Sequence, residues 1–212
     1  MSPERRLAAG AATLLLCGQY LAAEAITAAA WPRPYSYSRN YISDLGVSPC
    51  SATGICSPLA AVMNGGFVLA GLLALVSAFL LRSTLRPRLR WAVLALTTVH
   101  AVGSITVGLV HSAPGTLAGT PHLHVMGAYA AILGGNLALM GAGLSVRSDL
   151  AGPAFRGLSV ACGAFGLGCG LALVLSRGWP PGLLERGAVD TITLWEMAAG
   201  LALLGRIKRL PT

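Results

Sequence analysis

Long apolar runs dominate the chain, and short polar segments separate them. Six of these runs have the length that an α-helix needs to cross a hydrocarbon core of about 30 Å. They cover residues 7–29, 58–81, 91–110, 124–146, 158–176 and 188–204. None alternates between apolar and polar positions as the strands of a membrane barrel do, and backbone groups in lipid must be paired internally. The pattern therefore predicts an all-α fold: a polytopic transmembrane bundle of six helices in a single domain.

The composition agrees with a membrane protein. Hydrophobic residues make up 55% of the 212 positions and charged residues only 10%, whereas charged residues approach about 25% in soluble domains. The run 7–29 follows a charged start, as a signal peptide does, but we expect it to be retained as the first spanning helix. Small residues recur at four-residue spacing in the second, fourth and fifth runs, which predicts close packing among these three helices.

Basic residues are distributed unevenly between the two sides of this topology. Eleven Lys and Arg residues fall on the side that holds both termini, and four fall on the other side. The positive-inside rule therefore predicts a plasma-membrane protein with cytoplasmic N- and C-termini. The net charge of +8 follows from the same bias, so we expect contact with anionic lipid headgroups and not with nucleic acid. The sequence identifies no protein partner.

The longest gap between the runs, residues 30–57, contains a polar segment rich in tyrosine. Such rings favour the headgroup region of a membrane. The same gap carries Cys50 and Cys56 on the predicted extracytoplasmic side, where an oxidising environment favours a disulfide between them. The other three cysteines lie inside predicted helices, where we expect small core residues.

Ionisable residues inside membrane helices are costly and therefore mark candidate sites. Glu24 lies in the outer half of the first run, and Asp190 and Glu196 share one face of the sixth. With the loop residues they predict a polar pocket that faces the extracytoplasmic side, where acids would select a cationic or hydroxyl-rich headgroup and Arg39 a phosphate. The candidate ligand-binding residues are Glu24, Arg39, Ser43, Asp44, Asn64, His111, Asp190 and Glu196.

Three of the four histidines, namely His111, His122 and His124, lie near the outer ends of the third and fourth runs. Together with Asp44 they would provide nitrogen and oxygen ligands for a zinc-like divalent metal, although their spacing matches no local metal motif. A haem would need a second histidine at the depth of His100, and the sequence has none there. A third interpretation is a structural polar network that only holds the helices together.

Three segments together resemble a known family. They are YSRNYISDLG at 37–46, MNGG at 63–66 and HLHVMG at 122–127. In this combination they are similar to the prokaryotic six-helix membrane family catalogued as domain of unknown function 998. The resemblance covers nearly the whole chain and implies the fold but no reaction. The chain departs from the family pattern at 110–114, where VHSAP replaces the usual aromatic-Pro-acid element.

A more distant similarity connects the chain to the Frag/DRAM/Sfk group, whose members carry a comparable Ile-Ser-Asp element after their first helix. By analogy with the group, that similarity implies that the protein handles lipids. A shared fold alone does not establish an activity.

Three functions remain open at this point. In the first, the protein binds or translocates a membrane lipid or lipid-like ligand in the outer pocket. In the second, it is a metal-dependent membrane hydrolase that acts on a lipid at the outer face, with Asp44, His122, His124 and Glu196 as candidate catalytic residues and a metal that activates water. In the third, it is a structural membrane protein without a ligand. The sequence does not decide whether the chain is an enzyme.

Overall fold

The computed structural model describes residues 1–32, 34–48, 57–110, 120–175 and 178–207. Within these ranges the chain is helical and contains no β-strand. The α-helices are α1 (Pro3–Leu16), α2 (Gln19–Ala29), α3 (Ala60–Leu81), α4 (Pro87–Leu109), α5 (Thr120–Ser145), α6 (Pro153–Leu175) and α7 (Pro181–Ile207), and the 3₁₀ helices are η1 (Ser43–Gly46) and η2 (Arg82–Thr84).

Six helical segments are long and apolar enough to cross a membrane: α1 joined with α2, and each of α3 to α7. The predicted class, an all-α bundle of six transmembrane helices, is therefore confirmed. Many large apolar side chains point outward from these segments, as expected where the surrounding solvent is lipid.

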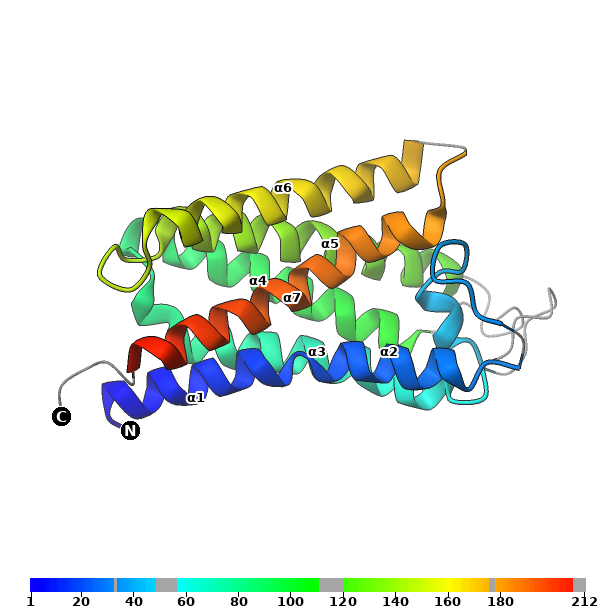
Figure 1. The fold of residues 1–212 in the computed structure, drawn as a ribbon, viewed down its shortest axis with the longest axis horizontal. Helices are drawn as coiled ribbons and strands as arrows, with labels where there is room; N and C mark the ends of the chain where they lie inside the picture. Colours follow the sequence, from blue (N-terminus) through cyan, green and yellow to red (C-terminus); the bar gives the residue numbers. More distant parts are fainter. Residues whose placement is uncertain (33, 49–56, 111–119, 176–177, 208–212) are drawn as a thin grey trace.

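The six spans pack as a closed ring in chain order. Each span contacts the one before it and the one after it, and α7 returns to pack against α1. Successive spans run in opposite directions, so the N-terminus and the end of α7 lie at the same end of the bundle (Figure 1). We call this the termini end. The opposite end, which carries residues 34–48 and η1, is the loop end.

Glycines let neighbouring spans approach closely. A Cβ on Gly134 of α5 would lie 2.6 Å from the backbone nitrogen of His100 on α4, and a Cβ on Gly103 of α4 would overlap the backbone of Ala131 on α5. The expected close packing holds for the fourth and fifth spans, α5 and α6, but is wrong for the second, because α3 packs against α1, α2 and α4. Small residues indicate that a helix packs closely without specifying its neighbour.

The α-helix of the first span is interrupted at Cys17 and Gly18, between α1 and α2. The amide of Tyr20 donates to the carbonyl oxygen of Cys17 at 3.1 Å, a short-range bond typical of a 3₁₀ turn. A Cβ at Gly18 would lie 2.8 Å from the sulfur of Met197 on α7, so α2 and α7 lie close together at this point. The side chain of Cys17 also interacts with Glu196. The interruption therefore lies beside a buried acid in the middle of the bundle.

Candidate functional site

Arg186, near the start of α7, is the centre of a buried polar network at the loop end. Its guanidinium forms an ion pair with Glu24 of α2, with 2.7 Å between Nη2 and Oε1. Nη1 donates to the carbonyl oxygens of Tyr37 at 2.7 Å and Asn40 at 3.0 Å, and Nη2 donates to the hydroxyl of Tyr35 at 2.7 Å. Arg186 therefore fixes the loop that follows α2 against the bundle.

The loop is held at two further points. The carboxylate of Glu185 accepts a hydrogen bond from the amide of Ile42. On the other side, Asn64 of α3 donates through Nδ2 to the carbonyl oxygen of Gly46 at 2.9 Å. A Cβ at Gly46 would overlap the Asn64 side chain, so this contact requires glycine. The predicted binding residue Asn64 thus anchors the end of η1.

Asp44, Ser43 and Arg39 occupy different surroundings within this loop. The carboxylate of Asp44 accepts from the amide of Tyr41 at 3.0 Å, and burial raises the pKa of this carboxyl above its usual range. Ser43 is half-buried and lines a small cavity beneath the loop, whereas Arg39 is exposed. The loop therefore covers the end of the bundle where the sequence suggested an open pocket.

The histidines are not gathered in the described part of the chain. His111 lies outside the described residues, and His122 is exposed. His124 is buried, and its Nδ1 donates to the carbonyl oxygen of Val110 at 2.6 Å. Among the described residues, no three His, Cys, Asp or Glu side chains are placed to hold a metal ion. The zinc-like site with Asp44, and the hydrolase hypothesis that depends on it, stay predictions.

The cysteines fall into two groups. Cys50 and Cys56 lie outside the described residues, so the predicted disulfide has no structural description. Cys17, Cys162 and Cys169 have free thiols. Cys17 is buried, and the other two are partly buried.

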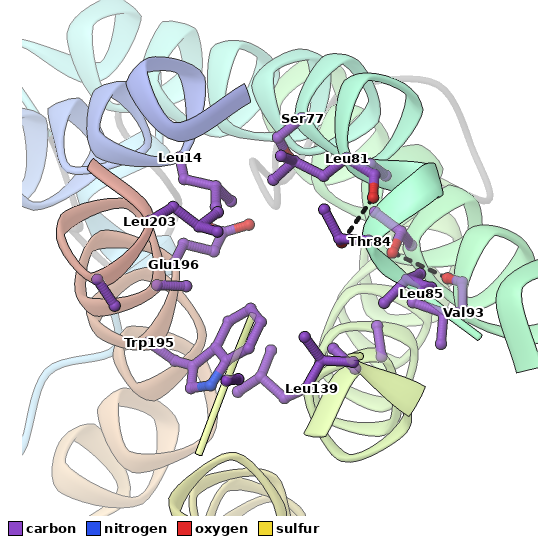
Figure 2. A pocket seen from close by; sticks show the side chains of 18 of the residues that line it. Leu14, Ser77, Leu81, Thr84, Leu85, Val93, Leu139, Trp195, Glu196 and Leu203 are labelled. Atoms are coloured by element: carbon purple, nitrogen blue, oxygen red, sulfur yellow. Dashed lines mark hydrogen bonds between the residues drawn. The ribbon is translucent and has the colours of Figure 1, made fainter. Parts of the chain in front are cut away.

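A cavity of about 290 Å³ lies inside the ring of helices, in the half toward the termini end. Every span contributes an apolar side chain to its wall: Leu14 (α1), Leu81 (α3), Val93 (α4), Leu139 (α5), Phe155 (α6) and Leu203 (α7). Figure 2 shows these helices around the space, with Trp195 beside it and Glu196 extending into it from α7. We call this space the central cavity.

Glu196 is the one carboxylate in the wall of the central cavity. It is 8% exposed, and it lies close to the thiol of Cys17, which donates to the carbonyl oxygen of Thr13 at 3.4 Å. The structure has two ion pairs within the described residues, and neither includes Glu196. A buried carboxylate without a basic partner costs several kcal/mol. Glu196 is therefore suited to receive a hydrogen-bond donor or a cation from a ligand.

A second cavity of about 50 Å³ lies between the central cavity and the loop end. It shares His100, Ile192 and Glu196 with the central cavity, and it reaches Ser43 and Glu185 under the loop. Its volume would hold about three to five water molecules, which need polar partners. The two cavities therefore meet at one layer of side chains in the middle of the bundle.

Asp190 has a different position from the one expected. It is half-buried, it lines neither of the two cavities, and its Oδ1 has no hydrogen-bond partner within the described residues. Of the three acids predicted to share one outer pocket, Glu24 is therefore paired with Arg186, Asp190 lies outside both cavities, and Glu196 alone faces them.

The apolar pattern of the sequence did not predict the roles of Arg186 and Glu185, because the run that predicts the last helix begins only at 188. The helix itself begins at Pro181. Proline is favoured at the first position of a helix, which was an available signal for this earlier start. A second signal was Glu24, since an acid inside a membrane helix calls for a basic partner.

Comparison with known proteins places these features in a family. Residues 8–202 match the family described as "Protein of unknown function (DUF998)". No curated protein and no solved structure matches the chain. Two of the segments that carry the resemblance meet in space, because Asn64 bonds to Gly46 at the end of η1. The match extends over nearly the whole chain, and the protein therefore belongs to the DUF998 family.

Proposed function

We propose that the protein binds a membrane lipid or a lipid-like molecule in the central cavity. The observation that carries this proposal is the combination of an apolar wall, built by all six spans, with one buried carboxylate. Ligand sites commonly have volumes of about 300 Å³ or more, with mostly apolar walls and a few fixed polar groups. An acyl chain would occupy the apolar part, and its headgroup would lie near Glu196.

This proposal moves the binding site away from the outer pocket expected from the sequence. At the loop end, Arg186 already neutralises Glu24 and holds the loop over the bundle. The charge bias predicts that the termini lie in the cytoplasm. In that orientation the central cavity occupies the cytoplasmic half, and a lipid would enter from the inner leaflet.

We further propose that the protein translocates this ligand across the membrane. The small cavity continues from the central cavity toward Ser43 and Glu185 at the loop end. The two spaces are separated by a layer that includes His100 and Ile192. Movement of this layer would connect them and give a headgroup a path through the ring.

Lipid retention in cavity-filling variants tests the proposal. Ala138 and Ala202 both line the central cavity, so Ala138→Phe and Ala202→Phe would each occupy ligand space from a different helix. The control is Ala161→Phe, because Ala161 is exposed on α6. Native mass spectrometry should find lipid on the wild type and on the control, and less lipid on both cavity variants. Equal retention by all four proteins would contradict the proposal.

A further inference from the structure

We infer that the ligand of the central cavity carries a protonated amine that pairs with Glu196. This inference rests on the proposed function and adds the chemical class of the headgroup. Some hydrogen-bonding groups in the cavity wall are already bonded within the protein, and the groups that are still able to bond a ligand determine its chemistry.

Apart from Arg206 at the termini end, the side-chain donors in the wall are engaged within the protein. The hydroxyls of Ser77, Thr84 and Thr97 donate to backbone carbonyl oxygens at 2.7 to 2.9 Å. The indole N–H of Trp195 donates to the hydroxyl of Ser159 at 2.8 Å. The three hydroxyl oxygens can therefore still accept a hydrogen bond from a ligand, but neither they nor the indole has a free proton to donate.

The remaining polar groups at the deep end of the cavity are acceptors. Nδ1 of His100 donates to the carbonyl oxygen of Ala131 at 2.8 Å, so Nε2 of the neutral ring carries a lone pair. Glu196 adds a carboxylate to the walls of the same two cavities that His100 lines. A primary ammonium has three N–H donors and no acceptor. It is the headgroup that complements a site made of acceptors.

The charges around Glu196 favour a cation in the same way. Cys17, which follows α1, offers only a thiol, and on α4 His100 already uses its Nδ1 proton. Among the residues that the structure describes, the one arginine in the cavity wall is Arg206. Ten residues separate it from Glu196 on α7, which is about 15 Å along the helix axis. Arg206 is therefore too distant to neutralise Glu196, in contrast to Arg186 beside Glu24.

Quenching of Trp195 fluorescence by matched probes tests this inference. One probe is a long-chain alkylamine with a terminal bromine, and the other is the corresponding brominated alcohol. Trp195 lines the cavity, and the signal that disappears in Trp195→Phe belongs to this residue among the four tryptophans. The amine and the alcohol partition differently into detergent. The measured quantity is therefore the ratio of the affinity for the amine to the affinity for the alcohol, compared between the wild type and each variant.

We expect the wild type to prefer the amine, and Glu196→Gln to reduce this preference by about 10- to 100-fold, the value of a charged hydrogen bond. Asp190→Asn is the matched control, because it removes an acid of the same helix that lines neither cavity. It should keep the preference. Glu196→Asp retains the charge and should also keep it, which provides a second folded variant.

The outcomes separate this inference from the proposed function. If both probes quench Trp195 but Glu196→Gln leaves the preference unchanged, the cavity binds amphiphiles and the inference about the amine is wrong. Loss of the preference in Asp190→Asn as well would also contradict it. If neither probe quenches Trp195, the proposed function itself fails.

Discussion

Two buried carboxylates of this protein have opposite surroundings. Glu24 is 4% exposed and is paired with Arg186, whereas Glu196 is 8% exposed and has no basic partner among the described residues. Loss of one partner from a buried pair leaves an unpaired charge, while replacement of an unpaired buried acid removes one. Substitution of these residues should therefore change stability in opposite directions.

Arg186→Met should lower the free energy of unfolding by about 3–5 kcal/mol, because it leaves the Glu24 carboxylate buried and unpaired. Adding Glu24→Gln to this variant should recover part of the loss. Denaturant unfolding in detergent measures both changes. The control is Arg147→Met, because the ion pair of Arg147 with Asp149 is exposed and should contribute no more than about 1 kcal/mol. An equal loss from both arginine variants would show that Arg186 is no more important than a surface residue.

Glu196→Gln should leave the delipidated protein as stable as the wild type or more stable at neutral pH, because an amide is less costly to bury than a carboxylate. Thermal unfolding of protein stripped of lipid tests this expectation. The same variant should retain less lipid, so stability and binding would change in opposite directions. A clear fall in the unfolding temperature would instead assign Glu196 a structural role.

At the scale of the elements, the helices extend beyond the apolar runs that predicted them. α7 begins at Pro181 and includes Glu185 and Arg186, which lie before the run at 188–204. Hydropathy identifies the part of a helix that contacts lipid. It does not identify a helical turn whose charges are covered by a loop of the same protein, as the contacts of Arg186 with Tyr37 show.

The packing of α4 against α5 depends on glycines, because neighbouring backbone atoms leave no space for a Cβ at these positions. Gly103→Ala should destabilise the protein by about 1–3 kcal/mol, because its Cβ would overlap the backbone of α5. Gly168→Ala on α6 is the control, since nothing lies within 4 Å of a Cβ there, and it should be neutral or stabilise the helix by up to about 1 kcal/mol. Unfolding of both variants in the same detergent gives the comparison. If Gly103→Ala and Gly168→Ala had the same free energy of unfolding, the close approach of α4 and α5 at Gly103 would not contribute to stability.

At the scale of the whole molecule, the alternating spans predict that the two ends of the bundle face different compartments. Trp179 is exposed at the loop end, and Arg88 is exposed at the termini end. In a background without the five native cysteines, Trp179→Cys should react with an impermeant maleimide added to intact cells. Arg88→Cys should react only after permeabilisation. The reverse pattern would invert the topology and place the central cavity in the outer half.

The sequence predicted the six-helix class and the family, because both depend on local patterns of residues. It did not predict the central cavity, which depends on the closure of the ring between α1 and α7. The apolar wall residues, such as Leu14 and Leu139, belong to the same residue types as the lipid-facing positions. Glu196 stood out in the sequence as an acid in an apolar run, but its separation from Glu24 and Asp190 required the three-dimensional packing.

The central claim is that a lipid-like molecule occupies the central cavity. The most direct test is an electron-density map of the protein purified from its native membrane without added lipid. We predict elongated density along Trp195 and Leu139, with a polar end within hydrogen-bond distance of Glu196. A cavity filled by rearranged side chains, or by water alone, would contradict the account.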